Sequence, residues 1–178
     1  MPLTLAQLAT LKAAIIADPT ANAIRVLGDS FSLGLWCNGA SATVVWRTST
    51  SGDAIRNAIV WANLTPAMAP DATTLWTNRA LSAQTKQISL QSMVQGQSQI
   101  GTGVAGIRAG FQDCLTALPT KADGTNQGAG WLAVQAVMQR PATRAEALFS
   151  TGTGTAASPG DLVFEGTISQ TELNQLVS

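Results

Sequence analysis

The sequence predicts a mainly α protein: a helical core domain with a short β strand or arm and a C-terminal extension. Apolar residues recur every three or four positions along most of the chain, and β-branched or alternating runs are short. A chain of 178 residues has room for one domain with extensions. We therefore expect a mostly helical core over residues 1–150, a Gly/Thr linker over residues 151–160 and a strand-helix arm over residues 161–178.

The N-terminal region is expected to begin with an amphipathic helix over residues 3–17, which Asp18 and Pro19 end. Its apolar face carries Leu5, Leu8, Leu11 and Ile15. Residues 43–48 are β-branched and aromatic, so they favour a strand or an extended arm.

The middle of the chain predicts three further helices. Asp53 is a natural N-cap for a helix through residue 63, and Asp71 is one for a long helix to about residue 94. The third is expected from about residue 104 to residue 118, before a polar, Gly-rich loop over residues 119–130.

A helix is expected to restart at Trp131, and Pro141 either kinks it or begins a new one. Thr143 and Glu146 have the spacing of a capping box, in a stretch that ends near Phe149.

The C-terminal arm is expected to contain a strand and a short helix. Residues 162–168 alternate as a strand does, and Ser169 and Glu172 form a capping box before the helix. A lone strand leaves its backbone groups unpaired. Residues 162–168 are therefore expected to pair with residues near 43–48 or with a neighbouring chain.

The composition favours assembly over catalysis. Ten basic and ten acidic residues give no net charge, and only 11% of residues are charged, against about 25% in ordinary soluble domains. Histidine is absent, which excludes Ser-His-Asp and Cys-His catalysis and zinc sites that use histidine. We expect no enzyme activity and no cofactor. Cys37 and Cys114 are expected to be buried thiols, with a disulfide as the alternative.

The sequence also limits the partners. The basic residues are scattered, so binding to a specific nucleic-acid sequence is not expected. No apolar run approaches the roughly 20 residues of a membrane span, and the start lacks the basic residues of a secretory signal. We expect a protein made in a cytoplasm, with no membrane partner.

Two short motifs resemble catalytic or nucleotide-binding signatures. Residues 28–32, Gly-Asp-Ser-Phe-Ser, are similar to the nucleophile block of SGNH esterases, but that chemistry needs a histidine, so we favour a turn with a local cap. Residues 101–106 match the G-x-G-x-x-G fingerprint without a βαβ context, which favours a turn between helices.

Two groups of polar residues are candidate interface residues. Gln84, Gln87, Gln91 and Gln95 fall at spacings of three, four and four on one helix. They form either a solvated face or a surface whose amides bond to a neighbouring subunit. Arg140 and Arg144 could share a helix face near Glu146, as a salt bridge in solvent or in an interface.

Three segments resemble a family of small virion proteins encoded by tailed bacteriophages and prophages. They are Trp46-Arg-Thr48, Ile59-Val-Trp-Ala-Asn-Leu-Thr-Pro66 and Arg140-Pro-Ala-Thr-Arg-Ala-Glu-Ala-Leu-Phe-Ser-Thr-Gly-Thr-Gly-Thr155, with Val163-Phe-Glu-Gly166 after the last. The similarity covers roughly residues 45–168 and is most specific at residues 139–166.

The resemblance implies a structural subunit of the virion, assembled in the bacterial host's cytoplasm. By analogy it implies a head-to-tail connector, an adaptor or collar protein whose copies form a homo-oligomeric ring under the portal, with portal, tail or other neck proteins as partners. The alternative is a capsid-decorating, tail-terminating or tail-tube protein.

The C-terminal arm is where contacts with a neighbour are expected, by strand addition. The candidate interface residues there are Val163, Phe164, Glu165, Leu173 and Leu176. A chain without residues 156–178 is expected to fold but not to join virions.

Overall fold

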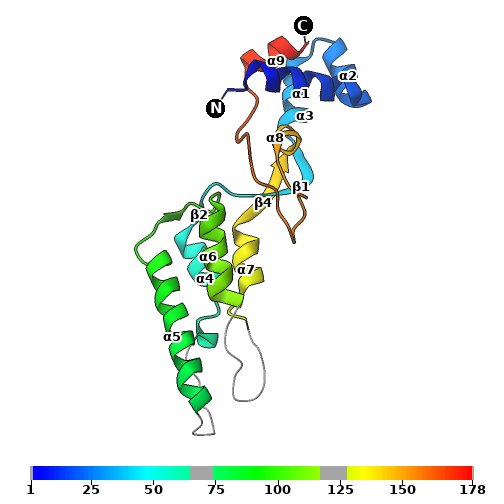
Figure 1. Ribbon diagram of the computed structural model, residues 1–178. Helices are drawn as coiled ribbons and strands as arrows, with labels where there is room; N and C mark the ends of the chain where they lie inside the picture. Colours follow the sequence, from blue (N-terminus) through cyan, green and yellow to red (C-terminus); the bar gives the residue numbers. More distant parts are fainter. Residues whose placement is uncertain (1, 65–73, 117–127, 178) are drawn as a thin grey trace. The chain divides into compact units, whose positions relative to one another are not determined.

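The computed structural model describes residues 2–64, 74–116 and 128–177, and residues 74–80 by their backbone alone (Figure 1). These residues form nine α-helices, one short 3-10 helix and four short strands, which confirms the mainly α prediction. None of the helices described is both long and apolar enough to span a membrane.

The chain divides into two compact units, but not at the expected boundaries. The terminal unit combines Met1–Trp46 with Gln139–Ser178, and the central unit is Arg47–Met138. The expected division was a core over residues 1–150 followed by a linker and an arm. It differs from the observed one because the segment after the linker packs on the N-terminal helices and shares their core.

The terminal unit contains five helices and one two-stranded sheet. Its elements are α1 (Leu5–Ala17), α2 (Pro19–Val26), α3 (Ser30–Asn38), β1 (Ala40–Trp46), β4 (Gln139–Thr143), α8 (Arg144–Phe149) and α9 (Gln170–Val177). Side-chain caps fix the helix starts: Thr4 and Gln7 form a capping box before α1, and Asp18 caps α2. The expected capping box of Ser169 and Glu172 is present before α9.

The core of the terminal unit joins both ends of the chain. Its buried side chains come from α1, α2, α3, α8, α9 and the segment before α9: Leu11, Ile15, Ala21, Leu33, Cys37, Ala145, Phe164, Ile168, Leu173 and Leu176. A Cβ on Gly34 would lie 2.8 Å from Leu173 Cδ1, so the absence of a side chain lets α3 approach α9 closely. The Leu3 N–H also donates to Glu172 Oε1 at 2.6 Å.

The sheet corrects two expectations. Pro141 neither kinks nor begins a helix, because residues 139–143 form β4, antiparallel to β1, with Pro141 opposite Val44. Residues 162–168 do not form the expected strand. Instead the Gly160 N–H donates to the Val44 carbonyl at 2.9 Å, and the Trp46 N–H donates to the Gly160 carbonyl at 3.0 Å.

The Gly/Thr segment therefore lies along the edge of β1 that β4 leaves open. The Val44 N–H donates to the carbonyl of Gly154, which has a φ of +66°. A Cβ at this position would collide with the Thr43 side chain, so glycine suits both the left-handed backbone and the close approach. The segment is irregular, as expected, but it covers an edge strand.

Among the residues described, the central unit contains four α-helices, one short 3-10 helix and one pair of short antiparallel strands. Its elements are β2 (Thr50–Ser51), α4 (Gly52–Ala58), η1 (Trp61–Asn63), α5 (Thr74–Val94), β3 (Gln99–Ile100), α6 (Ala105–Thr116) and α7 (Trp131–Val137). The helices α4 and α6 both contact α5 and α7. The buried side chains include Ile55, Leu90, Phe111, Leu115 and Val134.

Helix boundaries in the central unit differ from the prediction at α4. The helix ends at Ala58 instead of continuing to residue 63, and Ser51, not Asp53, is its N-cap. Asp53 lies in the first turn and pairs with Arg56. Asp71 and most of the loop over residues 119–130 lie outside the described residues.

Gly52 is expected to be essential for the central unit. A Cβ there would collide with the backbone carbonyl of Gln97, next to the bond between the Gly52 N–H and the Ser98 carbonyl. We expect Gly52→Ala to lower the free energy of unfolding by about 2 kcal/mol or more, as overpacking does. Chemical denaturation followed by circular dichroism measures this.

Gly106 provides the matched control. It lies in α6, and nothing lies within 4 Å of a Cβ built on it. Gly106→Ala is expected to be neutral or to stabilise by up to about 1 kcal/mol, because alanine favours helix. Equal destabilisation by the two substitutions would contradict the steric explanation.

The structure also changes the expectation for a chain without residues 156–178. That segment holds Phe164, Ile168, Leu173 and Leu176, all buried in the terminal unit. We now expect the truncated chain to lose the folded terminal unit, because removing several buried side chains costs more than the roughly 5–15 kcal/mol that stabilises a domain. Full protection of α1 and α3 in hydrogen exchange would show that this expectation is wrong.

Candidate functional site

The predicted interface residues separate into two groups on different units. Three of the four glutamines lie on α5 in the central unit and Gln95 lies in the turn directly after it, whereas the other seven residues lie in the terminal unit. Gln84, Gln91 and Gln95 are exposed, and Gln87 is half-buried. Arg140 and Arg144 do not share a helix face, because Arg140 is in β4 and Arg144 begins α8.

Arg140 is part of an ion-pair cluster within the chain. Its Nη1 and Nη2 donate to the two carboxylate oxygens of Glu146 at 2.7 and 2.8 Å, and Nη2 lies 3.4 Å from Glu165 Oε1. The Glu146 side chain is 2% exposed and also accepts from the N–H groups of Thr143 and Gly166. The predicted capping box of Thr143 and Glu146 is therefore confirmed, and its carboxylate also binds Arg140.

The ionisation of Glu146 follows from these partners. Burial raises the pKa of its carboxyl group, but hydrogen bonds from Arg140, Thr143 and Gly166 outweigh burial and lower the pKa below its ordinary value. The hydrogen bond to Glu146 in turn raises the pKa of Arg140. The pair joins β4, α8 and the segment before α9, so its geometry supports a structural role.

The Arg144 side chain is held by the backbone and a side chain of α3. Its Nη1 donates to the Trp36 carbonyl at 2.9 Å, and its guanidinium carbon lies 5.3 Å from the centre of the Trp36 ring. Arg144 remains exposed. It borders a hollow of about 320 Å³ together with Trp36, Asp18, Ser41 and Leu148.

Most of the apolar residues expected to contact a neighbour are buried in their own chain. Phe164 packs edge-to-face against Phe149 with ring centres 6.1 Å apart, and Leu173 and Leu176 lie in the core. Val163 is 55% exposed and Glu165 is also exposed. Of the five candidate residues in the arm, Val163 and Glu165 are therefore accessible to another chain, whereas the other three are buried.

A group of exposed apolar side chains that the sequence did not predict lies at the corner between α2 and α3. They are Val26, Leu27, Phe31 and Leu35, with exposed fractions of 69, 81, 71 and 62%. Phe31 and Leu35 are four residues apart and lie on one side of α3. They border a hollow of about 270 Å³ with Asn38, Ile168 and Leu173. Helical periodicity in residues 19–38 could have revealed this surface, but Gly28 interrupts the pattern.

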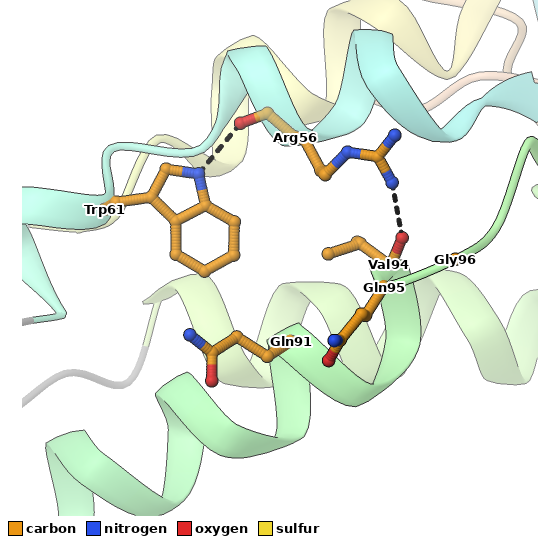
Figure 2. A pocket seen from close by; sticks show the side chains of 6 residues that line it. All are labelled: Arg56, Trp61, Gln91, Val94, Gln95 and Gly96. Carbon is orange, nitrogen blue, oxygen red and sulfur yellow. Dashed lines mark hydrogen bonds between the residues drawn. The ribbon is translucent and has the colours of Figure 1, made fainter.

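The central unit contains a larger hollow between α4, η1 and α5, of about 600 Å³. Figure 2 shows the Trp61 ring and the Gln91 side chain bordering this space. Arg56 crosses one end, where Nη1 donates to the Val94 carbonyl at 2.6 Å, and the Arg56 carbonyl accepts from Trp61 Nε1 at 2.9 Å. The wall of this hollow therefore presents the aromatic ring of Trp61 and the side-chain amides of Gln91 and Gln95.

The two short motifs have structural roles in the described residues. Asp29 caps α3 by accepting from the Ser32 N–H at 3.0 Å, and Ser30 Oγ accepts from Gln170 Nε2 at 2.8 Å. This is the turn with a local cap that we favoured. In the Gly-rich segment, buried Arg108 donates to the carbonyls of Thr102 and Gly103 at 3.0 and 2.8 Å.

Both cysteines are free and buried, as predicted. Burial raises the pKa of Cys37 to about 11 and also raises the pKa of Cys114, so both thiols stay protonated near neutral pH. Among the residues described, no three acidic or cysteine side chains gather into a group that could hold a metal ion.

Comparisons with known proteins found no matching family model, no matching curated protein and no matching solved structure.

We expect the Glu146 ion pair to set much of the acid sensitivity of the terminal unit. A lowered carboxyl pKa contributes stability that is complete above the ordinary value of 4.5 and is lost as pH falls through the lowered value. Glu146→Gln should lower the free energy of unfolding at pH 7 by about 3 kcal/mol, because Arg140 loses its buried partner. The same variant should lose less further stability than wild type below pH 4.5, measured by denaturation across pH.

Glu165→Gln is the matched control, since Glu165 contacts the same arginine from an exposed position. Its effect at pH 7 is expected to be below about 1 kcal/mol. A larger loss in Glu165→Gln than in Glu146→Gln would contradict the assignment.

Proposed function

We propose that this chain is a non-enzymatic structural subunit of a tailed-phage virion, a head-to-tail connector whose copies form a ring under the portal and join capsid to tail. It is assembled in the bacterial host's cytoplasm and contacts portal, tail or other neck proteins. The observation that carries the proposal is the set of large apolar side chains left exposed on a surface with few charges.

These exposed side chains occur on both units. Leu5, Leu27 and Phe31 in the terminal unit are 86, 81 and 71% exposed, and Leu132 on α7 in the central unit is 78% exposed. Single exposed leucines are ordinary, but groups such as the α2–α3 corner are typical of surfaces that bind other proteins.

The low charge supports the same proposal. Only 11% of residues are charged, so burying this surface desolvates few ions. Arg140 and Glu146, the most buried ion pair described in the terminal unit, already satisfy each other within the chain. The resemblance at residues 139–166 adds the virion context.

Cryo-electron microscopy of the intact particle tests the proposal. Density for this chain in a ring beneath the portal would support it. Density on the capsid lattice or along the tail would favour a decoration, terminator or tube protein instead, and absence from purified particles would contradict a virion role altogether.

The α2–α3 corner is expected to be needed for incorporation into particles. We expect Phe31→Lys to reduce the amount of the chain in purified particles at least tenfold, because it places a charge in a buried contact. The isolated variant should keep its melting temperature, since Phe31 is 71% exposed. Quantitative mass spectrometry of particles from a complemented deletion strain measures the amount.

Ala13→Lys is the control, since Ala13 is an exposed residue of α1 outside that corner. Its incorporation is expected to equal wild type. Equal loss in both variants would indicate a general effect of added charge, and normal incorporation of Phe31→Lys would exclude this corner as a contact.

A further inference from the structure

The helix α5 carries a second lengthwise stripe besides the one in its core. Its members are Leu81, Gln84, Ile88 and Gln91 on the helix and Gln95 in the turn directly after it, at spacings of three, four, three and four. The Gln95 N–H donates to the Gln91 carbonyl at 2.8 Å, so the helical spacing continues to Gln95. This is the a and d spacing of a coiled coil, which keeps side chains on one seam of a helix. The stripe includes three of the four predicted glutamines and two apolar residues that the sequence analysis left out.

The described side chains of α5 place this stripe outside the core. Ala83, Leu90 and Val94 are buried against the rest of the central unit. Leu81 and Ile88 are 56 and 58% exposed, and all three glutamines are exposed as well. Gln87 lies between the two stripes and is half-buried, so it does not belong to the seam.

The charge pattern indicates what can cover the stripe. None of its five residues is charged, and the flanking Thr85 and Ser92 are uncharged too. Lys86 is directed elsewhere, since its Nζ donates to the Asp113 carbonyl on α6 at 2.6 Å. A charged partner would find no counter-ion on this seam, whereas a copy of the same seam meets no like charge.

The glutamine side chains are complementary to themselves. Each amide is both donor and acceptor, so amides from two copies can pair without leaving a buried charge. Leucine and isoleucine at alternate positions supply the apolar contact of a helix pair.

We propose that the stripe of α5 packs against the same stripe of a second copy of this chain, as a two-helix or multi-helix seam within the assembly. This deepens the proposed function and rests on it, because it names one contact between copies of the subunit. Gln91 and Gln95 also line the hollow beside Trp61, so the contact surface continues from the helix into that hollow (Figure 2).

The contact is expected to be weak by itself. A specific interface buries about 800 Å² on each partner, which exceeds what five side chains on one helix cover. Self-association of the isolated chain should therefore appear at high concentration, and other contacts in a ring would strengthen it.

Cross-linking of the full chain tests the proposal. Ile88 is the central residue of the stripe, so Ile88→Cys comes close to its counterpart whether the helices run parallel or antiparallel. Both native thiols are buried, so the wild-type chain gives the background. We expect a covalent dimer from Ile88→Cys with a short bis-maleimide at high protein concentration.

Ser89→Cys is the matched control, because Ser89 is also exposed to solvent but lies on another side of α5. It is expected to give the wild-type background. Equal cross-linking of the two variants, or none from Ile88→Cys, would overturn the proposal.

A second variant measures the equilibrium. Ile88→Lys should weaken self-association in sedimentation velocity at least tenfold relative to Ser89→Lys, since it buries a charge in the seam. No difference between these variants would also overturn the proposal. If Ile88→Cys cross-links but the chain is absent from purified particles, only the proposed function is contradicted. If the chain forms a ring in particles but Ile88→Cys does not cross-link, only this inference is contradicted.

Discussion

The bidentate pair of Arg140 and Glu146 is the interaction on which the terminal unit depends most. It joins the strand β4 to the first turn of α8, and the same carboxylate holds the Gly166 N–H in the segment that leads to α9. A carboxylate that is 2% exposed is tolerated only when its oxygens are satisfied. Four N–H donors, three on β4 and one on the segment before α9, meet that requirement, and they fix where the C-terminal segment lies against β4 and α8.

The sequence predicted the helices with strong local signals and failed where contacts distant in the chain decide the structure. Leu11 and Ile15 mark α1, and the pairs Thr143/Glu146 and Ser169/Glu172 form the capping boxes that their spacing indicates. Pro141 was misplaced in a helix because its partner Val44 lies about a hundred positions away in sequence. Residues 162–168 alternate, yet Phe164 and Ile168 are buried without a strand ladder.

For the candidate site too, the sequence predicted what depends on one helix and not what depends on contacts between distant segments. The glutamine stripe was visible in the sequence because it depends on one helix. Whether Leu81 and Ile88 face solvent depends on which side of α5 the other helices cover, and periodicity does not give that. Likewise, Leu173 and Leu176 have the pattern of a docking helix, and their burial shows that the chain's own N-terminal helices occupy that surface. Exposed apolar residues, not apolar residues in general, therefore define the surfaces available to partners.

The division of the chain has a consequence for biosynthesis. The central unit is an insertion between β1 and β4, and the Arg47 N–H bonds to the Met138 carbonyl where the chain enters and leaves it. During translation, all residues of the central unit emerge before α8 and α9 exist. The central unit can fold on the ribosome, whereas α1 to α3 keep part of their core uncovered until α9 has left the exit tunnel. A product truncated before α9 therefore remains distinguishable from one that contains α9 by its open N-terminal core.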